Sequence, residues 1–209
     1  MASRKTNRKK GEENVKQFVT FEGIDGSGKS TVSKQVFDTL RSQDIDVVLT
    51  IEPTDTEIGQ FVKHCIATDA DPFVTTFAFL ADRIQHALAI QEHLDKGSIV
   101  LCDRYMDSTI AYQAAQLEGQ IENPLDWLQE LSKPRIPKPE LTFLFVIEPK
   151  RALQRIQHRD TLIPFEQQQF LEKVHQNYLL LAQEKRFRKI DATQPVQHLV
   201  DQCVEDICK

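Results

Sequence analysis

The stretch FEGIDGSGKST occupies residues 21–31 of this 209-residue chain. It contains the spacing Gly-x-x-x-x-Gly-Lys-Ser, which is the Walker A pattern. Apolar residues precede it, and Val32, Val36 and Leu40 follow at the four-residue spacing of an amphipathic helix. A strand, a glycine-rich turn and a helix in this order predict a loop that binds the phosphates of a nucleoside triphosphate.

The residue types of this turn suit phosphate binding. Glycines let the backbone curl so that its N–H groups point at phosphate oxygens, and the following helix directs its positive end at the same anion. Lys29 is expected to reach the β- and γ-phosphates, and the Ser30 hydroxyl to ligate Mg²⁺. The expected nucleotide-binding residues are Gly23, Ile24, Asp25, Gly26, Ser27, Gly28, Lys29, Ser30 and Thr31.

Short apolar segments alternate with helical patterns along the chain. Strands are expected at 18–22, 46–51, 98–102, 141–147 and 187–190. Nearly continuous apolar runs such as 141–147 are typical of a parallel sheet covered on both faces. The alternation predicts a doubly wound α/β domain with its ligand at the carboxyl ends of the strands.

A long helix is expected to begin at Asp71-Pro72, where an N-cap residue precedes a proline at the first helical position. Apolar residues recur along it at helical spacing. These residues are expected to form its buried face: Phe73, Phe77, Leu80, Ile84 and Leu88.

Charge divides the chain into two parts. The net charge is −5, yet residues 1–16 carry six basic and two acidic side chains, which leaves −9 on the remainder. We expect 1–17 to be a disordered basic tail and 18–209 to form one domain. An acidic body repels a nucleic-acid backbone, so no nucleic-acid partner is expected.

The apolar runs are too short to span a membrane, and no membrane partner is expected. The first residues contain no apolar run, so no secretory signal is expected. Its four cysteines are scattered and show no C-x-x-C spacing, as in reduced proteins of the cytoplasm.

A second motif, DRYMDSTIAYQ, follows the third expected strand at 103–113. Asp103, at a strand end beside the Walker A turn, can organise Mg²⁺ and its waters, and Arg104 offers a planar fork for phosphate. Ser108 and Tyr112 would share a helix face. Taken alone, the Asp-Arg pair could instead be an exposed ion pair, although this is the less favoured interpretation. A GTPase is disfavoured because no [NT]-K-x-D element follows.

Together with ADRIQH at 81–86, these motifs resemble the thymidylate kinase family. The resemblance runs from about Phe18 to the C-terminus and is strongest to archaeal members. It implies a P-loop kinase fold, with a mostly parallel five-stranded sheet, helices on both faces and a short lid at about 155–164. It also implies Mg²⁺-assisted phosphorylation of dTMP to dTDP by ATP, usually by a homodimer. Three further segments contribute: TIEPTDTEIGQ (50–60), FEQQQFLEKVHQNYLLLA (165–182) and IDATQPV (190–196).

The resemblance also assigns roles to residues of the acceptor site. It implies that Phe79 stacks on thymine and that Arg83 hydrogen-bonds the base, with Ser108 and Gln113 as polar contacts around it. From helical spacing alone, Phe79 could equally be a core residue.

The remaining roles concern sugar and phosphate. Asp25 matches the P-loop carboxylate near the nucleotide sugar and phosphates, Arg104 matches the acceptor-phosphate ligand, and Tyr112 matches the ring packed near C2′.

The chain departs from the family pattern at two places. Many members carry an arginine beside the Glu-Pro of the second strand, where this chain has Ile51 and Thr54 around Glu52-Pro53. Some members carry a basic P-loop residue at the position of Gly26, and members without it use a lid arginine. Arg155 and Arg159 are the candidates, and Arg159 is the expected one because it lies nearer the lid loop.

The expected catalytic residues are therefore Lys29, Asp103, Arg104 and Arg159, with Ser30 on the metal. An acceptor phosphate is already an anion, so positioning and charge neutralisation should suffice without a strong base. Two alternatives stay open. One is another deoxynucleotide or deoxynucleoside kinase, and the other is a non-catalytic nucleotide-binding paralogue.

Overall fold

The computed structural model describes residues 17–133, 135–156 and 168–209. Five strands form one sheet in the order β2-β3-β1-β4-β5, with every neighbouring pair parallel. The predicted α/β class and parallel sheet are confirmed. The strands are β1 (Gln17–Glu22), β2 (Val47–Ile51), β3 (Ile99–Asp103), β4 (Leu141–Val146) and β5 (Phe187–Asp191).

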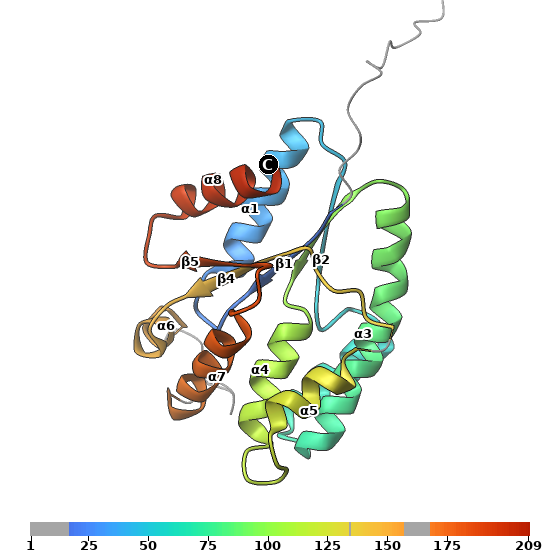
Figure 1. Cartoon of the computed structure of the whole chain (residues 1–209), viewed down its shortest axis with the longest axis vertical. Coiled ribbons are helices and arrows are strands. Elements are labelled where there is room, and N and C mark those ends of the chain that lie inside the picture. Colours follow the sequence, from blue (N-terminus) through green and yellow to red (C-terminus); the bar gives the residue numbers. More distant parts are fainter. Residues whose placement is uncertain (1–16, 134, 157–167) are drawn as a thin grey trace, which may run out of the picture.

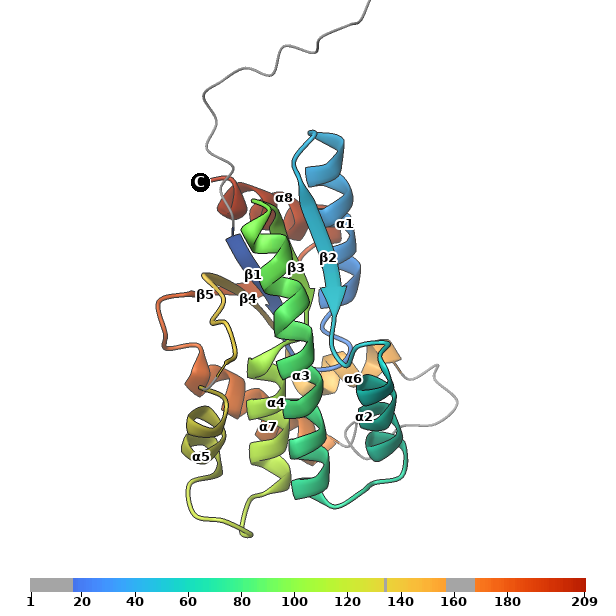
Figure 2. The ribbon, with the colours of Figure 1, turned by 90° about the vertical axis from the view of Figure 1, so that its right-hand side faces the viewer.

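Helices cover both faces of this sheet. Figure 1 shows α1 (Lys29–Ser42) and α8 (Val196–Ile207) on one side, and α4 (Met106–Gln116) and α7 (Gln168–Leu181) on the other. In Figure 2 the long α3 (Pro72–Asp95) runs in front of β3, with α2 (Glu57–Ala67) beside it. The other described helices are α5 (Pro124–Leu131) and α6 (Pro149–Ile156).

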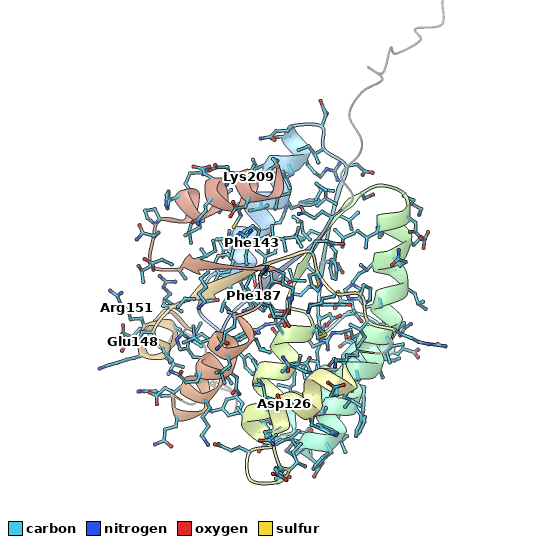
Figure 3. The ribbon with its side chains drawn as sticks, viewed as in Figure 1. Asp126, Phe143, Glu148, Arg151, Phe187 and Lys209 are labelled. Atoms are coloured by element: carbon cyan, nitrogen blue, oxygen red, sulfur yellow. The ribbon has the colours of Figure 1, made fainter. Side chains whose placement is uncertain are left out.

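Helices on both faces explain why β1, β3 and β4 are almost entirely buried. Phe21 and Phe143, on neighbouring strands, are fully buried with ring centroids 5.4 Å apart. Figure 3 shows Phe143 and Phe187 within the body of the molecule. Burying each side chain of this size stabilises the fold by about 1.5–3 kcal/mol. The core therefore fixes the position of the sheet and of the loops at its edge.

The predicted buried face of α3 is wrong. Leu80 is buried, but Phe77, Ile84 and Leu88 are 51%, 41% and 73% exposed. The buried side instead carries polar groups, among them Asp82, Arg83 and His86. Because α3 is apolar around most of its circumference, spacing could not decide which side faces the protein.

Two expected segments lie wholly or partly outside the described residues. Residues 1–16 are one of them, and β1 begins at Gln17, the last residue of the expected tail. The expected lid is the other, since α6 ends at Ile156 and Arg159 is not among the described residues. In the parts of the chain that the structure describes, we find no helix with the length and hydrophobicity of a membrane crossing.

Candidate active site

The Walker A turn joins β1 to α1 at the carboxyl edge of the sheet. Gly26 and Gly28 have φ angles of 80° and 91°, a left-handed conformation that glycine adopts without penalty. Helix α1 starts at Lys29, and its N-cap Gly28 makes no side-chain capping bond. The first N–H groups of the helix therefore remain available to an anion.

Lys29 is the positive charge of this turn. Its residue is only 5% exposed, and burial lowers the pKa of Lys29 to about 8, with repulsion from Arg104 acting in the same direction. The carboxylates of Asp25, Asp103 and Glu22 oppose this shift. A phosphate anion at the turn would favour the charged form further.

Asp103 and Ser30 offer oxygen ligands beside Lys29. Asp103 ends β3, and its buried Oδ1 has no hydrogen-bond partner among the described residues. Ser30 is an exposed residue in the first turn of α1. The described residues contain no cluster of three or more acidic, His or Cys side chains that could hold a metal alone. These two oxygens thus fit Mg²⁺ as kinases usually bind it, with one or two protein ligands and the remaining ligands supplied by substrate phosphates and water.

Arg104 projects from the loop after β3 with a strained backbone, at φ 65°. Its Nη2 donates to Asp25 Oδ1 at 2.7 Å, and its Nη1 donates to Ser108 Oγ at 3.2 Å. The guanidinium also lies over the Tyr112 ring, 5.3 Å from the centroid. The fork is therefore held between the Walker A turn and α4.

Asp25 is held as a carboxylate. Burial alone would raise its pKa, but the charges of Arg104 and Lys29 and a hydrogen bond from Tyr112 outweigh burial and hold the pKa of Asp25 well below its usual value. The Tyr112 hydroxyl donates to Asp25 Oδ2 at 2.9 Å and accepts from the Asp25 N–H at 3.2 Å.

One functional candidate, Glu22, was missed by the sequence reasoning. It is fully buried at the end of β1, where it accepts from the Ser108 hydroxyl at 2.5 Å and from the Tyr105 N–H at 2.8 Å. Burial raises the pKa of Glu22 to about 7, and the nearby Asp107 adds to this. An acidic residue at the end of the expected strand, directly before the Walker A turn, was the available signal.

A pocket opens between α3 and α4 beside the Walker A turn, and we call it the α3–α4 pocket. Its lining brings together every residue predicted to bind the acceptor: Asp25, Phe79, Arg83, Arg104, Ser108, Tyr112 and Gln113. It also includes Glu52, Pro53, Ile66, Tyr105 and Thr109, which were not predicted. Residues from five separate segments thus converge on one cavity.

Two buried donors in this lining lack partners. Arg83 uses Nε and Nη2 on Glu52 at 2.9 and 2.5 Å, and Nη2 also donates to Thr109 at 2.8 Å. Gln113 accepts from Thr76 through Oε1 at 3.0 Å. Arg83 Nη1 and Gln113 Nε2 have no partner among the described residues. Since unpaired buried donors are rare, these two suit carbonyl oxygens of a ligand.

Arg155, at the end of α6, contacts the Walker A turn. Its Nη1 donates to the Gly26 carbonyl at 3.4 Å and its Nη2 to the Ala192 carbonyl at 2.9 Å. A Cβ on Gly26 would lie 2.2 Å from the Ala152 carbonyl oxygen, also in α6. The close packing of α6 thus leaves no room for a side chain at position 26.

Comparison with known proteins agrees with this geometry. The family model for thymidylate kinase matches residues 21–203. A probable thymidylate kinase of Methanosarcina mazei is 40% identical over 195 residues, which cover 91% of this chain and 95% of the relative. A probable thymidylate kinase of Sulfurisphaera tokodaii is 38% identical over 192 residues, covering 92% and 96%. The Walker A turn, the DRY segment and the pocket between them therefore belong to a member of the thymidylate kinase family.

Proposed function

We propose that this protein transfers the γ-phosphoryl group of ATP to dTMP, giving dTDP and ADP. The observation that carries the proposal is the α3–α4 pocket beside the Walker A turn, with buried Arg83 and Gln113 donors left unpaired. Thymine presents two carbonyl oxygens and an N–H at its edge, so it can accept from both donors. Phe79, in the same lining, supplies an apolar ring for the flat base.

Arg104 is proposed to bind the phosphate of dTMP. It lines the pocket, and its ion pair with Asp25 also connects it to the Walker A turn. Tyr112, bonded to the same carboxylate, would pack at C2′ of the sugar and leave no room for a ribose hydroxyl. Asp25 thereby joins the donor and acceptor halves of the site.

Charge neutralisation is the proposed mechanism. The acceptor phosphate is a nucleophile without deprotonation, so residues need only align the two phosphates and balance their charge. Lys29 would face the β- and γ-phosphates, and Arg104 the acceptor. Ser30 and Asp103 are the residues that would hold Mg²⁺, which would supply further positive charge beside the phosphates. Arg159 stays the predicted lid cation, with Arg155 the alternative because it contacts Gly26.

Coupled ADP release tests the function. We expect turnover with ATP and dTMP to exceed turnover with dUMP, dCMP, dGMP or AMP. Lys29→Ala should lower kcat by about 10²–10³ with the fold intact, as for other preorganised cations. ATP binding without turnover of any acceptor would favour the non-catalytic paralogue instead, and preference for another acceptor would favour a different kinase.

We further propose that the protein is a homodimer that pairs through α3. The exposed side of α3 repeats apolar residues at intervals of three and four: Val74, Phe77, Ala81, Ile84 and Leu88. This is the spacing of a helix–helix seam, and an isologous contact would cover it with its own copy. An uncovered apolar stripe of this length is unusual on a monomer.

Sedimentation velocity at micromolar concentration tests the dimer. Leu88→Glu should give monomers, whereas Leu180→Glu, the same change at an exposed leucine on α7, should leave the dimer intact. A monomeric unaltered protein, or a dimeric Leu88→Glu variant, would contradict the proposal.

We also propose that the protein is located in the cytoplasm, since all four cysteines are free thiols and three of them are buried.

A further inference from the structure

The direction of Arg83 is set by its partner, Glu52. A guanidinium is planar, so fixing two of its nitrogens fixes the third. Glu52 Oε2 accepts from both Nε and Nη2 of Arg83, and both side chains are at most 3% exposed. The only nitrogen left for the α3–α4 pocket, Nη1, therefore takes its direction from the Glu52 carboxylate, together with Thr109, which accepts from Nη2 at 2.8 Å.

The orientation of Glu52 depends in turn on His86. The second carboxylate oxygen, Oε1, lies 2.9 Å from His86 Nδ1. A carboxylate can only accept, so Nδ1 carries the proton. The other ring nitrogen, Nε2, lies 2.7 Å from Thr50 Oγ1, which fixes the imidazole ring from its far side. His86 and Arg83 thus hold the two oxygens of one buried carboxylate.

This chain of contacts follows from two periodicities. Thr50 lies in β2 and Glu52 directly follows the strand, with its N–H still bonded to the Asp103 carbonyl of β3. The two residues are two apart, so their side chains point to the same side. Arg83 and His86 are three apart on α3 and share a helix face. Strand and helix therefore present matching pairs, Thr50 to His86 and Glu52 to Arg83, and the His86–Glu52 bond joins them.

We propose that His86 is a positioning residue for acceptor recognition. It is not part of the lining of the α3–α4 pocket, so it acts through Glu52 on Arg83. The inference rests on the proposed role of that pocket in binding dTMP. Without the His86 bond, Oε1 of the buried Glu52 carboxylate is left unpaired, and Glu52 is held only through its other oxygen by Arg83. The carboxylate can then shift to find another partner, and the direction of Arg83 Nη1 shifts with it, limited by the bond to Thr109.

Substitutions at position 86 separate this role from simple packing. His86→Asn places an N–H near the position of Nδ1 and keeps the bond to Glu52. His86→Gln reaches toward Thr50 and loses that bond. Titration calorimetry should show dTMP affinity about tenfold weaker in His86→Gln and His86→Ala, the scale of one hydrogen bond to a buried charge. His86→Asn should stay within about threefold of the unaltered protein, and ATP affinity should not change.

The selectivity of the kinase gives a second measurement. The dTMP/dCMP ratio of kcat/KM should fall in His86→Gln and stay near that of the unaltered protein in His86→Asn. The reason is that Arg83 distinguishes a carbonyl from an amino group only when it is correctly oriented. His93→Ala, two turns further along α3, is the matched control and should leave the ratio unchanged. If His86→Ala does not fold, the Asn and Gln variants still decide.

Each outcome has one meaning. If His86→Asn and His86→Gln have the same dTMP affinity and the same ratio, the side chain only fills space and the inference is overturned. If the unaltered protein fails to phosphorylate dTMP, the proposed function fails instead. Loss of ATP affinity in parallel with dTMP affinity would show a general structural effect and would also overturn the inference.

Discussion

Gly26→Ala should disrupt the packing of the Walker A turn against α6. Gly26 has φ 80°, and an added Cβ would lie 2.2 Å from the Ala152 carbonyl oxygen. The left-handed conformation costs an alanine about 1 kcal/mol. Relieving a backbone contact this short requires α6 or the turn to move, and overpacking of this kind costs about 1–3 kcal/mol more. We expect a total loss of about 3 kcal/mol.

Gly119→Ala provides the matched control. Gly119 has nearly the same φ, 79°, but an added Cβ there meets nothing within 4 Å. It should therefore lose only the conformational term. For a chain of this size, 1 kcal/mol corresponds to about 2–4 °C in Tm. Scanning calorimetry should show Gly119→Ala melting about 3 °C below the unaltered protein and Gly26→Ala about 9 °C below it.

The same displacement should lower kcat/KM for ATP. Arg155 donates to the Gly26 carbonyl, so moving either partner alters the phosphate loop and its nearest α6 cation together. A misplacement of about 1 Å can cost about a hundredfold in rate. We expect kcat/KM for ATP to fall on this scale in Gly26→Ala, measured at saturating dTMP. If Gly26→Ala matches Gly119→Ala in both Tm and kcat/KM, then α6 does not pack on the turn and the reasoning is wrong.

Three other predictions concern charge, base and tail. ATP should bind about tenfold more weakly at pH 9 than at pH 7, because Lys29, with a pKa of about 8, loses its charge as the pH rises; calorimetry should show this, and Lys29→Arg should flatten the profile. Arg83→Ala should lower the dTMP/dCMP ratio of kcat/KM by about tenfold to a hundredfold, because dCMP would no longer leave a buried donor of Arg83 unpaired, a penalty of about 1–3 kcal/mol. Phe79→Ala should lower kcat/KM for both dTMP and dCMP and leave their ratio near its original value. An unchanged ratio in Arg83→Ala would show that Arg83 does not select the base. Deleting residues 1–16 should leave Tm and turnover nearly unchanged, and a tenfold loss of activity would mean that this segment docks on the domain.

The order of strands and helices, and the position of the phosphate loop, could be read from the sequence. Those features depend on local periodicity and on turn chemistry, which neighbouring residues encode. The Walker A turn at 21–31 and the DRY segment at 103–113 each end an apolar strand, so both had to meet at one edge of a parallel sheet.

Only the tertiary structure decided what each buried polar side chain contacts. Arg83 was predicted to face the base, yet two of its nitrogens hold Glu52, and no spacing relates residue 83 to residue 52. The sequence could not show which side of α3 is exposed either, because Phe77, Ile84 and Leu88 recur with a helical period whatever they pack against. Periodicity along the chain determines which residues share a face. What that face packs against is set by the long-range arrangement of strands and helices, which brings segments distant in sequence into contact.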